Sequence, residues 1–93
     1  MNTSLVKADN YSLFTFGSTS HALKAETVLK ELGAEFLIMP TLREISASCG
    51  LSVKIFPENA EPYYDMLTNH NVAVQSVYHV QKINRKNNVE KVM

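Results

Sequence analysis

The chain has little of several residue types, and each shortage narrows what it can be. Its 93 residues contain a single cysteine, Cys49, which excludes an intramolecular disulfide. Small secreted domains usually depend on disulfides, so we expect a protein of the reducing cytoplasm. The only glycines are Gly17, Gly33 and Gly50, which are too scattered to form a glycine-rich phosphate loop.

Long hydrophobic runs and an excess of charge of one sign are also lacking. No apolar run approaches the ~20 residues that cross a bilayer, and the first ten residues lack the apolar stretch of a signal peptide. Nine basic residues balance nine acidic ones, so no overall field attracts the chain to nucleic acid or to an anionic membrane. We therefore expect neither as a partner. The length suits one compact domain.

Hydrophobic spacing predicts four strands and two helices. The strands are expected at residues 11–17, 34–39, 51–56 and 72–78, and the helices at residues 20–32 and around residues 60–68. Gly33 and Asn71 are expected to end the helices, because both tolerate the left-handed backbone conformation. Residues 1–80 would form the single α+β domain, followed by a polar, basic tail at residues 81–93 that is expected to be frayed or separately helical.

The order of these elements is βαββαβ. It predicts a ferredoxin-like α+β fold, with an antiparallel four-stranded sheet and two helices on one face, because this arrangement satisfies the right-handed crossover rule. A doubly wound parallel sheet is the alternative. It is less favoured, since two helices would leave one face of such a sheet bare.

This fold brings two distant loops to one end of the sheet. The first and second strands run in the same direction, so the loop after the first strand lies beside the loop that joins the second and third strands. Cys49 should therefore lie near the amino end of the first helix, reachable from solvent. Free backbone amides and the helix dipole at that end favour a thiolate over a thiol.

The candidate site combines the thiol with polar residues of both loops. Cys49 is the expected nucleophile, and His21 and Arg43 are the charged or titratable groups that could activate it. Gly50 leaves room for an attacking group. The candidate binding residues are Ser18, Thr19, Ser20, Ser46, Ser48 and Gly50.

Each of these residues also has a plainer interpretation. A lone cysteine at the start of a strand is commonly a small buried hydrophobe, and Ser18 and Ser20 suit helix capping. His21 and Arg43 could be solvated surface residues. No HxH, CxxC or HExxH spacing is present, so we expect no metal and no cofactor. A cysteine–histidine hydrolase would need an orienting third residue that the sequence does not identify.

Two stretches carry a family resemblance. The segment FGSTSHALKAE (residues 16–26) and the segment PTLREISASCGL (residues 40–51) together resemble the small bacterial family of selenium/sulfur carrier-like proteins. The second motif is the more specific, with an arginine–glutamate pair, small residues and a cysteine–glycine pair that leads into a strand. The resemblance covers about two thirds of the chain and does not explain the tail.

The resemblance implies a function for the thiol. Cys49 would carry a persulfide or selenopersulfide, received from a cysteine desulfurase-type donor and delivered to an acceptor protein. The chain would then be a thiol-based carrier more than a turnover enzyme. The alternative is a non-catalytic interaction or regulatory module, which could be a homodimer, in which Cys49 is only packing. A thiol-dependent enzyme with a pocket beside Cys49 is a third hypothesis.

Overall fold

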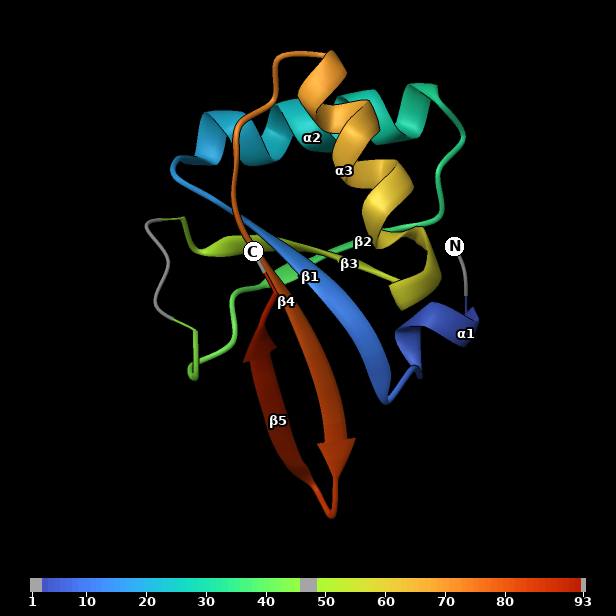
Figure 1. The fold of residues 1–93 in the computed structure, drawn as a ribbon, viewed down its shortest axis with the longest axis vertical. Helices are drawn as coiled ribbons and strands as arrows, with labels where there is room; N and C mark the ends of the chain where they lie inside the picture. Colours follow the sequence, from blue (N-terminus) through green and yellow to red (C-terminus); the bar gives the residue numbers. More distant parts are fainter. Residues whose placement is uncertain (1–2, 46–48, 93) are drawn as a thin grey trace.

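A computed structural model describes residues 3–45 and 49–92. The strands are β1 (Asn10–Phe16), β2 (Leu37–Pro40), β3 (Leu51–Ile55), β4 (Val74–Ile83) and β5 (Lys86–Lys91). The helices are α1 (Thr3–Val6), α2 (Thr19–Glu31) and α3 (Ala60–Asn69), and the 3-10 turn η1 (Pro57–Asn59) precedes α3. Within the described residues the strands form one antiparallel sheet in the order β2-β3-β1-β4-β5 (Figure 1).

The predicted four-stranded, ferredoxin-like fold is wrong, because the sheet has a fifth strand. Residues 81–83 continue β4, and β5 returns along it from Lys86, paired with Ile83, to Lys91, paired with Tyr78. The expectation of a frayed or helical tail is therefore wrong as well. Both turn residues have positive φ, 51° at Asn84 and 67° at Arg85, which is the backbone of a tight two-residue hairpin. Figure 1 shows this hairpin extending away from α2 and α3.

Helix α2 begins and ends at local signals in the sequence. The Ser18 hydroxyl accepts a hydrogen bond from the backbone N–H of His21 at 3.4 Å, which caps the first turn. The buried face carries Ala22, Ala25, Val28 and Leu29 at helical spacing. Gly33 follows the helix with φ at 70°, a conformation that costs other residues energy. The prediction that Gly33 ends this helix is confirmed.

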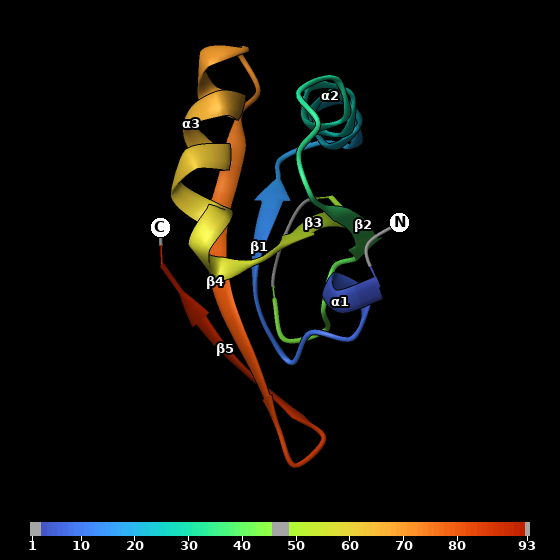
Figure 2. The same cartoon turned by 90° about the vertical axis from the view of Figure 1, so that its right-hand side faces the viewer.

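The main core lies between the sheet and the two longer helices. Phe14 and Phe16 of β1 and Val53 and Ile55 of β3 pack in one buried cluster with the apolar face of α2 and with Leu67 of α3. Figure 2 shows α2 and α3 beside each other at one end of the molecule. Because strand side chains alternate between faces, the helix side of β3 carries Leu51, Val53 and Ile55, as the sequence predicts.

The other face of the sheet has a smaller core. Tyr11, Leu13 and Val80 pack there with Ile45, which comes from the β2–β3 connection. The Nζ atom of Lys54 lies 4.3 Å from the centre of the Tyr11 ring and donates a hydrogen bond to the carbonyl oxygen of Val6. Burial lowers the pKa of Lys54 below its ordinary value, since the charged form loses hydration.

Strand directions place two loops together. β1 and β2 both pair antiparallel with β3, so they run in the same direction and their carboxyl ends lie at the same end of the sheet. The β1–α2 loop and the β2–β3 connection therefore approach one another.

None of the helices in the described part of the chain has the length and apolar character needed to span a bilayer.

Candidate functional site

The side chain of Cys49 lies at the first turn of α2. Its Sγ–H group donates to the hydroxyl oxygen of Thr19 across 3.7 Å, although the two residues are 30 positions apart in the sequence. Thr19 is the first residue of α2, where the helix dipole is positive and backbone N–H groups lack partners within the helix. The prediction that the thiol lies beside the amino end of this helix is confirmed.

The expectation that this thiol is reachable from solvent is wrong. Cys49 is 2% exposed and belongs to the main core cluster, with Phe14, Val53 and Ala22. The reason is strand alternation: Cys49 precedes Leu51 by two residues and therefore faces the helix side, beneath α2. A small, apolar thiol is readily accommodated in such a position.

The sulfur atom also accepts a backbone hydrogen bond. The N–H group of Leu51 donates to Cys49 Sγ at 3.4 Å. The thiol therefore sits between a hydroxyl and an amide inside an otherwise apolar cluster. The Thr19 hydroxyl and the Leu51 amide could both donate hydrogen bonds to a negatively charged sulfur.

Thr41 holds the backbone on both sides of the Cys49–Gly50 peptide. Its hydroxyl donates to the carbonyl oxygen of Cys49 at 3.0 Å, and its amide donates to the carbonyl oxygen of Gly50 at 2.9 Å. The same hydroxyl lies 2.8 Å from Ser52 Oγ. Because the single hydroxyl hydrogen of Thr41 is used on Cys49, Ser52 is the donor in this pair.

Thr41 was not among the predicted site residues. In the structure, β2 and β3 pair with Pro40 opposite Leu51. Continuing that register by one residue places Thr41 opposite Gly50, within reach of the cysteine backbone. The sequence predicts both strands but not their register, so the position of Thr41 could not be predicted from it.

The β1–α2 residues make different contacts from those predicted. Ser18 caps α2, and Ser18, Thr19 and Ser20 are all exposed. The Nδ1 atom of His21 accepts a hydrogen bond from the backbone N–H of Ala73 at 3.3 Å, which directs this nitrogen to the α3–β4 connection. Among the described contacts of Ser18, Thr19, Ser20 and His21, only that of Thr19 reaches the thiol.

The predicted site residues of the β2–β3 connection also make contacts other than those expected. Arg43 is exposed and, among the described residues, makes no hydrogen bond to the thiol. The next two residues belong to the opposite face, where Ile45 packs in the smaller core and the Glu44 carboxylate helps to raise the pKa of Tyr11, after the larger effect of burial. Gly50 is exposed, and a side-chain carbon there would meet no atom within 4 Å. Ser46 and Ser48 lie outside the described residues.

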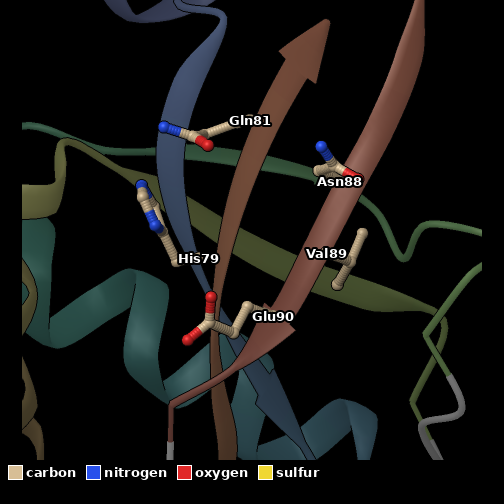
Figure 3. Close-up of a pocket in the computed structure, with 5 residues that line it drawn as sticks. All are labelled: His79, Gln81, Asn88, Val89 and Glu90. Carbon is tan, nitrogen blue, oxygen red and sulfur yellow. The ribbon is translucent and has the colours of Figure 1, made fainter.

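Concave surfaces occur away from the thiol. Figure 3 shows one on the β4–β5 hairpin, where His79, Gln81, Asn88, Val89 and Glu90 surround a cavity of about 300 Å³. A groove of about 450 Å³ lies between α3 and the base of the same hairpin. Cys49 lines neither. In the part of the chain that the structure describes, no group of three or more His, Cys, Asp or Glu side chains could hold a metal ion.

The comparisons with known proteins identify the family. The model of the family described as "Putative Se/S carrier protein-like" matches residues 10–79. This match includes every strand from β1 to β3, both longer helices and the Cys49 junction, and the chain belongs to this family. Searches of curated proteins and of solved structures gave no significant match.

Proposed function

We propose that this chain carries sulfur or selenium as a persulfide or selenopersulfide on Cys49. The observation that carries the proposal is the position of Cys49 Sγ, 3.7 Å from the hydroxyl of the first α2 residue, in a chain of a Se/S carrier-like family. A persulfide anion at this position would benefit from the positive helix end and from the Leu51 N–H group.

The transfer chemistry needs only the thiol and a partner. The Cys49 thiolate attacks the terminal sulfur of a persulfide on a cysteine desulfurase-type donor, the sulfur–sulfur bond of the donor breaks, and the donor cysteine leaves as a thiolate. The product is a persulfide on Cys49, and no net oxidation occurs. Delivery to an acceptor protein repeats the exchange in the other direction. A reducing cytoplasm, which keeps Cys49 as a free thiol, suits this chemistry.

Burial of the thiol places a condition on this function. Because Cys49 is 2% exposed, a donor reaches the sulfur only after the Cys49–Gly50 segment moves away from the core. Such local opening is rare in the folded state, so loading should depend on contact with the donor protein. The same burial would protect a loaded persulfide from small thiols.

Mass spectrometry tests the proposal directly. The full chain is incubated with a cysteine desulfurase and cysteine, and separately with a selenium donor, and its intact mass is measured without reduction. We expect the addition of one sulfur or selenium atom, reversed by dithiothreitol and absent in the Cys49→Ser variant. An unmodified chain, under conditions in which an established carrier protein becomes loaded, would contradict the proposal.

The burial of Cys49 favours a second candidate function. In this alternative the domain is a non-catalytic interaction module, and Cys49 contributes only packing within the core. It predicts that Cys49→Ala or Cys49→Val retains the binding of every partner. The carrier function predicts that either variant still folds but accepts no sulfur.

A further inference from the structure

The outer edge of β5 has no neighbouring strand within the described chain, because β5 ends the sheet. Alternate residues of an edge strand direct their backbone N–H and C=O groups away from the sheet, where they can pair with another strand. β5 carries Lys86 near its start and Glu90 near its end. An antiparallel copy of the same strand, centred on Asn88, would place each Lys86 opposite a Glu90.

The base of the hairpin borders an apolar groove with acidic residues. The groove, about 450 Å³ in volume, is lined by Pro57, Ala60, Glu61, Tyr64, Asp65, Val77 and Val92. Val92 is 57% exposed, and Glu61 and Asp65 are exposed carboxylates of α3. Among the described residues that line this groove there is no lysine or arginine, so its two carboxylates favour a cationic group from another molecule.

The tip of the hairpin has the complementary character. Ile83 is 50% exposed, and the exposed cations Arg85 and Lys86 follow it in the turn and at the start of β5. Figures 1 and 2 show this tip at the opposite end of the molecule from α3. The tip therefore cannot reach the groove of its own chain, which leaves both surfaces open to another molecule.

We propose that two copies of this chain associate through their β4–β5 hairpins. The two β5 strands lie antiparallel, which extends each sheet into the other and sets the tip of one hairpin beside the base of its partner. In this register Arg85 lies opposite Lys91 of the second copy, and the groove carboxylates Glu61 and Asp65 near that position offset these two like charges. The contact is the same on both sides of a twofold axis, so it closes as a dimer. This proposal does not depend on the function of Cys49.

The dimer should be weak and sensitive to salt. One edge strand and one groove on each copy bury less surface than most stable dimers, and the charges lie at its rim, where ions screen them. Analytical ultracentrifugation of the full chain over a range of concentrations should show a monomer–dimer equilibrium that weakens at high salt. A monomer at every concentration, at low salt, would overturn the proposal.

Charge reversal tests the contact between tip and groove. Arg85→Glu, or Glu61→Lys together with Asp65→Lys, should each weaken self-association about tenfold or more, since like charges would face each other. A mixture of these two variants should associate again, because each native tip and each reversed tip then meets a groove of opposite charge. Glu26→Lys with Glu31→Lys makes the same charge change on α2 and should leave the equilibrium unchanged.

A second pair of substitutions tests the strand register. Lys86→Glu should weaken the dimer, because the new carboxylate would face Glu90 of the second copy, and Lys86→Glu with Glu90→Lys should restore it. Circular dichroism verifies that each variant is folded. If none of the groove, tip and register substitutions changes self-association, the dimer forms through another surface. That result would refute the proposed hairpin contact.

Discussion

Thr41 fixes the Cys49–Gly50 junction through its amide and its hydroxyl together. Replacing the hydroxyl by a methyl group in Thr41→Val keeps the shape of the side chain but removes the donor to the Cys49 carbonyl and the acceptor for Ser52. We predict a loss of about 1–3 kcal/mol in the free energy of unfolding. The rate of Cys49 alkylation in the folded state should rise, because the segment over the thiol opens more often.

Thr15→Val is the matched control for this prediction. Thr15 is 1% exposed and its hydroxyl donates to the carbonyl oxygen of Ser76, so the substitution removes a buried hydrogen bond on β1. Thr15→Val should lower the free energy of unfolding by a similar amount. If the two variants have similar free energies of unfolding, Cys49 should be alkylated faster in Thr41→Val than in Thr15→Val. Equal rates would contradict a local role for Thr41 at the thiol.

Tyr11, in the smaller core, should make the stability of the folded chain depend on pH. Burial, followed by the negative charges of Glu44 and Asp9, raises the pKa of Tyr11 above its ordinary value of about 10. A raised pKa in the folded state means that the contribution of Tyr11 to stability is present below pH 10 and is lost as the pH rises through the folded-state value. The depressed pKa of Lys54 acts in the opposite direction.

Alkaline absorbance titration checks this shift. The wild-type chain should show a phenolate that forms later than that of a tyrosine in water, and Tyr11→Phe should remove this late step. The variant should also lose less stability than the wild type above pH 10, because it has no phenol whose ionisation favours the unfolded chain. Identical titration curves would show that another tyrosine is responsible.

At the scale of single residues, the sequence located the thiol but not its surroundings. The proximity of Cys49 to Thr19 follows from strand direction alone. The burial of Cys49 depends on which face of the sheet the residues just before β3 occupy. Because Cys49 precedes Leu51 by two residues, strand alternation would have placed it on the helix side. The contacts of His21 with Ala73 depend on a loop path that no local pattern encodes.

Helix α2 ends where its sequence provides a residue suited to the left-handed conformation. Gly33 has φ at 70°, and an alanine there would be strained by contact of its Cβ with the backbone. We predict that Gly33→Ala lowers the free energy of unfolding by about 1 kcal/mol. Chemical denaturation of the full chain provides the measurement.

Gly17 offers a matched glycine without this requirement. Its φ lies outside the left-handed region, and a Cβ there would meet no atom within 4 Å. Gly17→Ala should be neutral or slightly stabilising, because it reduces the freedom of the unfolded chain. Equal destabilisation by both substitutions would show that the conformation of Gly33 is not the cause.

At the scale of elements, strong periodicity made α2, α3, β1 and β3 predictable, whereas the short helix α1 was not predicted and β2 begins at Leu37 instead of the predicted residue 34. Helix α2 and strands β1 and β3 lie within one or two residues of the predicted ranges. The β4–β5 hairpin was missed because Arg85 occupies the second turn position, where glycine is the usual signal. The β5 segment also has a single apolar residue, Val89, so it lacks the alternating pattern by which a strand is normally recognised.

For the whole molecule, the hairpin raises the question of what residues 81–93 contribute. The family match ends at residue 79, so the division into a domain at residues 1–80 and a separate tail remains a prediction. Val89 of β5 packs on the smaller core beside Val80. We expect a chain of residues 1–80 to fold, with a free energy of unfolding about 1–3 kcal/mol lower, because this apolar surface becomes exposed.

Circular dichroism and chemical denaturation of the shortened chain test this expectation. Retained helical signal with a cooperative but earlier transition would support an independent domain with a stabilising hairpin. A chain of residues 1–80 that lacks any cooperative transition would make the hairpin an obligatory part of the fold.

The proposed function requires that the folded domain holds a transferable sulfur atom on Cys49 and shields it. Cyanide removes the outer sulfur of a persulfide as thiocyanate, so the release of thiocyanate from the loaded, donor-free chain measures this claim directly. We predict slow release from the folded protein and rapid, stoichiometric release after unfolding. The absence of thiocyanate in both states would contradict the account.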